Sequence, residues 1–261
     1  MGRSLLFLIA APLVAQDLQD YQAALEQARR VNLELAKRLP NFVADEHAIR
    51  YKSGPVKPPD WKVIDHIDSE ISVKGRNTFT REHVFVEGKP WNKPTFQGTN
   101  WSVLFGVELT RLFDTKCNTK VEFDSQQTRG GRPVLVYRFQ AAENGCFGNY
   151  NIGGGILRGA KSFNPARTGR FYIEEPGGAF LGYEEEASGF PKGFGADTLR
   201  MSVTWDYVRA GESTQLLPVA ADLVGGLSTK ELWRVALTYT NHRRFAASTS
   251  VSFDTGHETP K

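Results

Sequence analysis

The sequence has few cysteines, no block of charge and no long apolar run. Two cysteines in 261 residues exclude a cysteine-rich metal cluster or a dense disulfide scaffold. No run of Lys or Arg exceeds two residues and the net charge is +3, which argues against a nucleic-acid-binding protein. The longest apolar run is too short to span a bilayer, so we expect no transmembrane segment.

The common catalytic and nucleotide-binding motifs are also absent. The sequence contains no G-x-S-x-G, H-x-x-x-H or C-x-x-C pattern. The glycine-rich stretch 151–162 lacks the contiguous Gly-Lys-Ser of a phosphate-binding loop, and Pro165 follows it instead of a helix signal. We interpret this stretch as a surface loop. We therefore expect no enzyme activity, no cofactor and no nucleic-acid partner.

The N-terminus has the layout of a secretory signal peptide. Arg3 precedes an apolar run from Leu5 to Ala15, and a polar start follows at Gln16. The alternative is a buried N-terminal helix. The signal-peptide interpretation divides the chain into residues 1–15, removed after Ala15, and a single domain over residues 16–261. It predicts a soluble periplasmic or secreted protein in an oxidising compartment.

The periodicity of apolar residues predicts two helices and many strands. Residues 17–39 and 99–113 each have apolar side chains at helical spacing, with Asp17 as a candidate N-cap of the first helix. Most of the remaining chain alternates apolar and polar residues in nine or ten segments separated by turns. This order predicts an α+β fold in which an antiparallel sheet carries two helices.

Three of the five histidines directly follow an acidic residue in predicted strands: His47, His66 and His83. Adjacent strand residues point to opposite faces, so none of these pairs forms a hydrogen-bonded dyad by itself. His66 and Asp68 share a face, and a second histidine from a neighbouring strand would complete a small metal site. The simpler interpretation, a polar solvent-exposed face, is the one we adopt, so we expect no metal.

The predicted helix at residues 99–113 has a strong apolar face. Trp101, Leu104, Phe105 and Leu109 lie on it, close in sequence to further tryptophans. Between this helix and a curved sheet there is either a filled core or a cavity for a lipid-like ligand. The sequence leaves both alternatives open, because a packed core and a lined pocket use the same residue types.

The two cysteines, Cys117 and Cys146, flank a predicted hairpin. Its apolar residues face one side if Phe123 lies opposite Tyr137 or Phe139, which calls for a three-residue turn at the Gly-Gly pair. This register brings the two thiols close together. We therefore predict a disulfide, which would stabilise the fold by roughly 3.5 kcal/mol in the chain-entropy model.

Several stretches together resemble a known superfamily. They are LPNFVADE, VEGKP, GGRPVLVYRF, GRFYIEEPGGAFLGYEEEASGFP and STQLLPVAADLV. Their order resembles a group of bacterial secreted proteins that is similar to the lipoprotein-carrier superfamily of LolA and LolB. The resemblance implies a strongly curved antiparallel sheet, a half-open barrel, with helices on its concave face. It also implies a cavity for acyl chains or lipoproteins and no catalysis.

Three hypotheses for the function follow. The first is a non-catalytic envelope protein that binds a lipid or lipoprotein acyl chain between sheet and helix, through Trp101, Leu104, Phe105 and Leu109. The second is a protein-interaction or sensor domain without a lipid cavity. The third is a hydrolase or metal enzyme on the histidine-bearing strands. A continuous apolar cavity would favour the first, a filled core the second, and convergent histidines the third.

Overall fold

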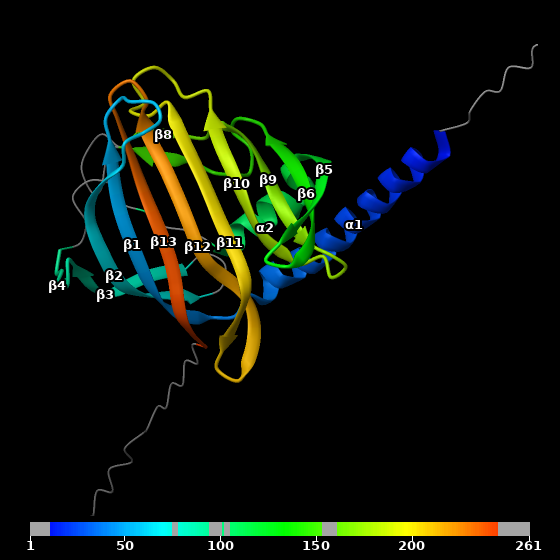
Figure 1. The fold of residues 1–261 in the computed structure, drawn as a ribbon, viewed down its shortest axis with the longest axis horizontal. Coiled ribbons are helices and arrows are strands. Elements are labelled where there is room, and N and C mark those ends of the chain that lie inside the picture. Colours follow the sequence, from blue (N-terminus) through cyan, green and yellow to red (C-terminus); the bar gives the residue numbers. More distant parts are fainter. Residues whose placement is uncertain (1–10, 75–77, 94–100, 102–104, 153–160, 245–261) are drawn as a thin grey trace, which may run out of the picture.

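One large antiparallel sheet dominates the fold (Figure 1). The computed structural model describes residues 11–74, 78–93, 101, 105–152 and 161–244. Eleven strands pair in the order β4-β3-β2-β1-β13-β12-β11-β10-β9-β6-β5. Their bounds are β1 Phe42–Ser53, β2 Lys62–Lys74, β3 Thr78–Val86, β4 Lys89–Pro90, β5 Lys120–Arg129, β6 Arg132–Ala141, β9 Ala166–Glu174, β10 Phe180–Ser188, β11 Thr198–Ala210, β12 Ser213–Leu227 and β13 Glu231–Arg244. A separate hairpin consists of β7 (Tyr150–Ile152) and β8 (Lys161–Phe163).

The sheet is open, because β4 and β5 form its two ends and are not paired with each other. Two helices, α1 (Ala11–Arg38) and α2 (Phe105–Phe113), lie on the same face, behind the strands from β5 to β11 in Figure 1. We call this the inner face. The prediction of an antiparallel sheet with two helices is confirmed. The strong curvature of a half-open barrel stays a prediction.

Both predicted helices have different starts in the structure. Helix α1 begins at Ala11 instead of residue 17, so Asp17 is not its N-cap. The residues before Asp17 contain Pro12 in the first turn and then good helix formers, so nothing stops the helix there. The expected cleavage site after Ala15 lies inside this helix. The signal peptide itself stays a prediction, since residues 1–10 are outside the described part of the chain.

Helix α2 begins at Phe105, whereas the sequence predicts a helix from residue 99. Trp101 lies outside the helix and is held by contacts to the sheet, which override its local helical spacing. A short 3₁₀ helix, Thr115–Cys117, follows α2. Among the described residues, no helix has the length and apolar character needed to cross a membrane.

A buried asparagine docks α1 on the inner face. The Asn32 amide donates to the carbonyl oxygens of Ala28 and Gly178 (2.8 Å each), and its oxygen accepts from the backbone N–H of Phe180 (3.0 Å). Gly178 has a positive φ of 76°, and a Cβ there would lie 3.3 Å from the Ala28 backbone. Glycine at this turn therefore allows the helix to approach the sheet closely.

The hairpin of β5 and β6 has the predicted register but a different turn. Phe123 pairs with Tyr137, as expected. The turn has two residues, Gly130 and Gly131, both with positive φ, and the expected three-residue turn is wrong. A β-bulge at Asp124 shifts the register by one residue and restores the apolar face.

Candidate functional site

The inner face over β5 to β11 is lined by large aromatic side chains. Tyr137 stacks on Phe171 with ring centroids 5.4 Å apart, and Phe180 meets Trp205 edge to face at 5.9 Å. All four side chains are at most 1% exposed. We call Tyr137, Phe139, Phe171, Phe180 and Trp205 the aromatic floor. Gly169 makes room for it, since a Cβ there would lie 2.6 Å from the Phe139 ring.

Helix α2 packs on the aromatic floor. Phe113 meets Phe171 and Phe180 edge to face, with ring centroids 5.3 and 5.9 Å apart. Leu109 and Leu112 are buried in the same core. The space between the described part of α2 and the sheet is thus filled by the protein's own side chains. Neither of the two best-defined surface hollows is lined by a residue of α2.

The four predicted ligand-binding residues have different positions. Leu109 lies at the α2 interface and is fully buried, and Trp101 is 6% exposed beside strands β1 to β3. Leu104 lies outside the described residues. Phe105 is the first residue of α2, and its side chain is outside the described part of the structure. Leu109 therefore lies at the predicted interface between helix and sheet, whereas Trp101 contacts strands β1 to β3 instead.

The Trp101 indole is hydrogen-bonded to a buried carboxylate that is not among the predicted site residues. The fully buried Glu46 accepts hydrogen bonds from the Trp101 indole N–H (3.2 Å), the Arg81 guanidinium (2.8 Å) and the Ser69 hydroxyl (3.1 Å). The Arg81 guanidinium also lies over the Trp101 ring, 4.7 Å from its centroid. These contacts hold the chain just before α2 against the inner face of β1 to β3.

A second buried ion pair joins β1 to β2. The Arg50 guanidinium donates two hydrogen bonds to the Asp65 carboxylate, at 2.7 and 2.5 Å. Both side chains are about one-tenth exposed or less. We call Glu46, Arg50, Asp65, Ser69 and Arg81 the ionic half of the inner face. Separating the partners of a buried ion pair is costly, so these pairs oppose the insertion of a ligand over this half of the inner face.

Sequence alternation contains a signal for this ionic half. Phe42, Ala44, Glu46, Ala48 and Arg50 share one parity in the first predicted strand. Since the apolar members of this set point inward, Glu46 and Arg50 must point inward too. A carboxylate and a guanidinium at inward positions predict buried partners of opposite charge.

Polar groups also lie buried between α2 and strands β9 and β10. The Arg167 guanidinium donates to the Glu185 carboxylate (3.0 Å), which also accepts from the Tyr150 hydroxyl (2.7 Å). Glu108 and Arg111 of α2 lie 3.9 Å apart at their closest charged atoms. Burial raises the pKa of the Glu108 carboxyl to about 7, although the Arg111 guanidinium opposes this shift.

Five side chains at this boundary each have a buried polar atom without a hydrogen-bond partner within the described residues. They are one oxygen each of Glu108 and Glu185, the Nε atoms of Arg111 and Arg167, and the hydroxyl of Tyr183. We call these five residues the orphan cluster. Unpaired buried polar atoms are costly, and each side chain regains a partner when water reaches it. These unpaired atoms lower the net stabilisation that α2 gains from its contact with the sheet on this side.

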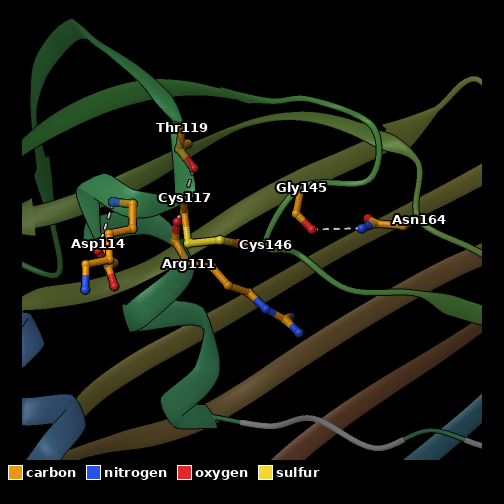
Figure 2. Close-up of a disulfide and its surroundings, with 8 residues drawn as sticks. Arg111, Asp114, Cys117, Thr119, Gly145, Cys146 and Asn164 are labelled. Atoms are coloured by element: carbon orange, nitrogen blue, oxygen red, sulfur yellow. Dashed lines mark hydrogen bonds between the residues drawn. A yellow bond between two sulfur atoms is a disulfide. The ribbon is translucent and has the colours of Figure 1, made fainter.

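The predicted disulfide is present at the C-terminal end of α2 (Figure 2). Cys117 and Cys146 are bonded, with their Cα atoms 5.3 Å apart. Two hydrogen bonds brace the surroundings, from Thr119 to the Arg111 carbonyl (3.2 Å) and from Asn164 to the Gly145 carbonyl (2.8 Å). The end of α2 is thus tied to the loop after β6, next to the orphan cluster.

The histidine-bearing strands form no metal site within the described part of the chain. His47 contacts the Asp68 carboxylate at 2.7 Å and the Thr240 hydroxyl at 3.2 Å. His83 lies 3.7 Å from Glu70 and is largely exposed. As the strand alternation requires, His47 is exposed on the outer face while its neighbour Glu46 is buried on the inner face.

The outer face has a groove of about 590 Å³ over β6, β9, β10, β11 and β12. Charged side chains of both signs line it, with Arg138, Arg170 and Arg200 beside Glu184 and Glu186. The arginines make surface ion pairs, two with Asp124 and one with Glu186. This groove is polar and suits a mixed-charge peptide better than a lipid.

Comparison with known proteins does not assign a family. No protein-family model and no curated protein matches this sequence. A crystal structure described as an outer membrane lipoprotein-sorting protein domain, from Vibrio parahaemolyticus, is similar over 87% of this chain and 94% of that chain, with 10% identity and a TM-score of 0.39. The structure of MucB in complex with MucA(peri) is similar over 85% of this chain and 99% of that chain, with 10% identity and a TM-score of 0.21. Both similarities are too low to assign a ligand or partner, so the resemblance to the lipoprotein-carrier superfamily stays a prediction.

Proposed function

We propose that the protein is a non-catalytic envelope protein that holds an apolar ligand between the sheet and α2. The ligand is a lipid or the acyl chain of a lipoprotein. The described space beneath α2 is filled by side chains, which by itself favours a protein-interaction domain, so the proposed ligand site opens only when α2 moves. The observation that carries the proposal is the composition of the α2 boundary. The aromatic floor offers apolar contacts to a ligand, while the orphan cluster lowers the free-energy cost of moving α2 away.

Two contributions lower the free-energy cost of exchanging α2 for a ligand. Each unsatisfied buried polar group costs about 1–3 kcal/mol, which is recovered when the group meets water. This recovery offsets part of the packing energy of Leu109, Leu112 and Phe113, which α2 loses on leaving. An acyl chain on the aromatic floor then gains about 0.8 kcal/mol for each buried CH₂ group.

The ends of α2 are attached differently, which gives the proposed movement a direction. The disulfide holds the C-terminal end at Cys117, while Trp101 is attached to the sheet through Glu46 and Arg81. Residues Leu104 and Phe105 lie between these two attachments in sequence. In the proposal they join Leu109 and Trp101 as ligand contacts, when α2 tilts about its disulfide-bonded end.

The proposed compartment is the periplasm or the extracellular space. The disulfide supports an oxidising environment, and the predicted signal peptide provides the route. The proposal assigns no catalytic residue and no cofactor. Instead, ligand burial supplies the binding energy, and the histidines on the outer face take part in surface contacts with carboxylates and hydroxyls.

Native mass spectrometry of the exported protein, followed by lipid extraction, tests this proposal. We expect a bound lipid species and displacement of a fluorescent fatty acid by the extracted lipid. Replacing Leu109 with Asn should weaken fatty-acid binding, whereas replacing the exposed Phe85 with Asn should leave it unchanged. Absence of both a bound lipid and fatty-acid displacement would refute the proposal.

The outer groove favours a second candidate, a protein-interaction domain. Its mixed charges and volume of about 590 Å³ suit an extended peptide segment of a partner. In this case, reversing the charges with Arg138→Glu and Arg200→Glu should abolish cross-linking to the partner. The stability of the variant should stay that of the wild type. If these variants keep every cross-link seen with the wild type, the groove is not the interface.

A further inference from the structure

The hairpin tip between β1 and β2 concentrates exposed apolar side chains. Of the six large hydrophobic residues that are exposed in the described chain, three lie here: Val56 (49%), Val63 (53%) and Ile64 (49%). They fall within nine consecutive residues of the sequence. The other three are scattered over α1, β3 and β11. We define the tip as residues 52–64.

Three lysines surround these apolar side chains. Lys52, Lys57 and Lys62 are all exposed, and Lys52 pairs with Lys62 across the hairpin. The tip contains Asp60 as its only acidic residue among positions 52–64, so its net charge is +2. Lysines directly opposite each other in a strand pair repel, and this cost needs a compensating partner of negative charge.

The tip extends beyond its neighbour on one side. Strand β3 pairs with β2 only from Ile67 onward, and Glu87 then contacts the backbone of His66. A β-bulge between Arg50 and Tyr51 changes the register just before the tip. Val63 and Ile64 are adjacent and both are exposed, because Ile64 is the extra residue of this bulge and the usual alternation of faces is interrupted there.

We propose that this tip docks on an anionic lipid bilayer, with Val56, Val63 and Ile64 entering the interface and the three lysines contacting acidic headgroups. Branched aliphatic side chains bury readily in the headgroup boundary, and lysines near an anionic surface attract it without needing a defined geometry. Trp61, half-buried within the tip, is a residue type enriched at membrane interfaces.

The composition of the tip fits a bilayer better than a protein partner. Protein interfaces are enriched in aromatic residues, Met and Arg and are depleted of Lys. This tip has three lysines and no arginine, and its exposed large apolar residues are aliphatic. It also lines neither of the two best-defined surface hollows.

Sedimentation of the full chain with vesicles tests this proposal. The vesicles contain equal parts of phosphatidylethanolamine and phosphatidylglycerol, with phosphatidylcholine vesicles as the neutral comparison. The variant K52Q/K57Q/K62Q should bind the anionic vesicles about 100-fold more weakly, from the attraction of each lysine to the surface. The control K89Q/K116Q/K120Q removes the same charge from exposed positions elsewhere and should bind like the wild type.

The apolar contribution is tested separately. We expect V56S/V63T/I64T to bind at least tenfold more weakly, because less apolar surface enters the bilayer. The matched control V31T/F85T changes exposed apolar residues outside the tip and should have no effect. Equal losses in tip and control variants, or wild-type binding by both tip variants, would overturn the proposal, and so would failure of the wild type to bind anionic vesicles.

Further measurements separate vesicle docking from loss of folding and from the proposed lipid-binding function. The melting temperatures of the lysine and aliphatic variants should match that of the wild type, since every side chain that they substitute is exposed. The vesicle-induced shift of tryptophan emission should be lost in W61F and kept in W91F. The tip variants should also bind the fluorescent fatty acid as the wild type does. Loss of vesicle docking is then distinguishable from loss of the proposed ligand site.

Discussion

The two halves of the inner face are built in opposite ways. Over β5 to β11, aromatic rings fill most of the space beneath α1 and α2, and one buried ion pair, Arg167 with Glu185, lies at the boundary with α2. In the ionic half, over β1 to β3, buried carboxylates meet guanidinium groups in direct hydrogen bonds. Apolar packing tolerates exchange of one apolar partner for another, whereas paired buried charges tolerate no loss of a partner. For this reason we place the proposed ligand site in the aromatic half.

The largest effect is expected from removing one partner of a buried charge pair. Replacing Asp65 with Ala removes the carboxylate that pairs with the buried Arg50 guanidinium and should lower the free energy of unfolding by about 3–5 kcal/mol. The double variant Arg50→Met, Asp65→Leu should be close to the wild type, because no buried charge remains. Denaturant unfolding of both variants checks this. A double variant as unstable as the single one would contradict the account of the ionic half.

A cavity in the aromatic floor should cost a similar or slightly smaller amount. Phe171→Ala removes a fully buried ring that contacts Phe113 and Tyr137 and should destabilise the protein by about 3–4 kcal/mol. The exposed Phe85 is the control, and its change to Ala should stay within about half a kcal/mol. A fatty acid should partly refill this cavity, so adding it should raise the melting temperature of Phe171→Ala. It should not raise the melting temperature of the Asp65 variant. The absence of a rise in Phe171→Ala would weaken the distinction between the halves.

Reduction of the disulfide should have a somewhat smaller effect on stability. Cys117 and Cys146 enclose about 30 residues, and opening this loop should lower the free energy of unfolding by roughly 3.5 kcal/mol or less. The double variant Cys117→Ser, Cys146→Ser should behave like the reduced protein. We expect faster hydrogen exchange in α2 than in β1 and β2 after reduction. Equal acceleration in both regions would show that the bond does not specifically anchor α2.

The smallest predicted effect concerns the protonation of Glu108. Its folded-state pKa of about 7 lies above the ordinary value of 4.5, so the folded protein holds this proton more tightly than the unfolded chain does. The resulting stabilisation is fully present below about pH 4.5 and is lost as the pH rises through 7, a change of about 3 kcal/mol at most. Unfolding curves of wild type and Glu108→Gln across this range should therefore diverge, with the wild type losing stability relative to the variant. The exposed Glu143→Gln is the control, and a constant difference between wild type and Glu108→Gln would contradict the assignment.

The sequence predicts the antiparallel sheet, the two helices and the disulfide, because each depends on local periodicity or on the spacing of two residues. The β5–β6 hairpin shows where such reasoning ends. The apolar side chains require Phe123 opposite Tyr137, and this pairing is present, but a bulge at Asp124 achieves it instead of a longer turn. A three-residue turn, or a two-residue turn with a bulge, would each pair these side chains. Only tertiary contacts select between them.

The candidate site was less predictable than the fold. Leu109 is at the predicted interface, but Trp101 is fixed by Glu46, a residue 55 positions away in the sequence. The orphan cluster joins α2, β9 and β10, so its members are unremarkable polar residues until the sheet is assembled. By contrast, Glu46 and Arg50 were accessible to prediction, since strand parity alone places both on the inner face.

Hydrogen exchange of the protein with and without a medium-chain fatty acid tests the central claim most directly. If the ligand takes the place of α2 on the aromatic floor, the rate of amide exchange in Phe105–Phe113 should change on ligand binding. The rate in strands β1 and β2 of the ionic half should stay the same. An unchanged α2, or an equal change in both halves of the sheet, would contradict the claim that an apolar ligand binds between the sheet and α2.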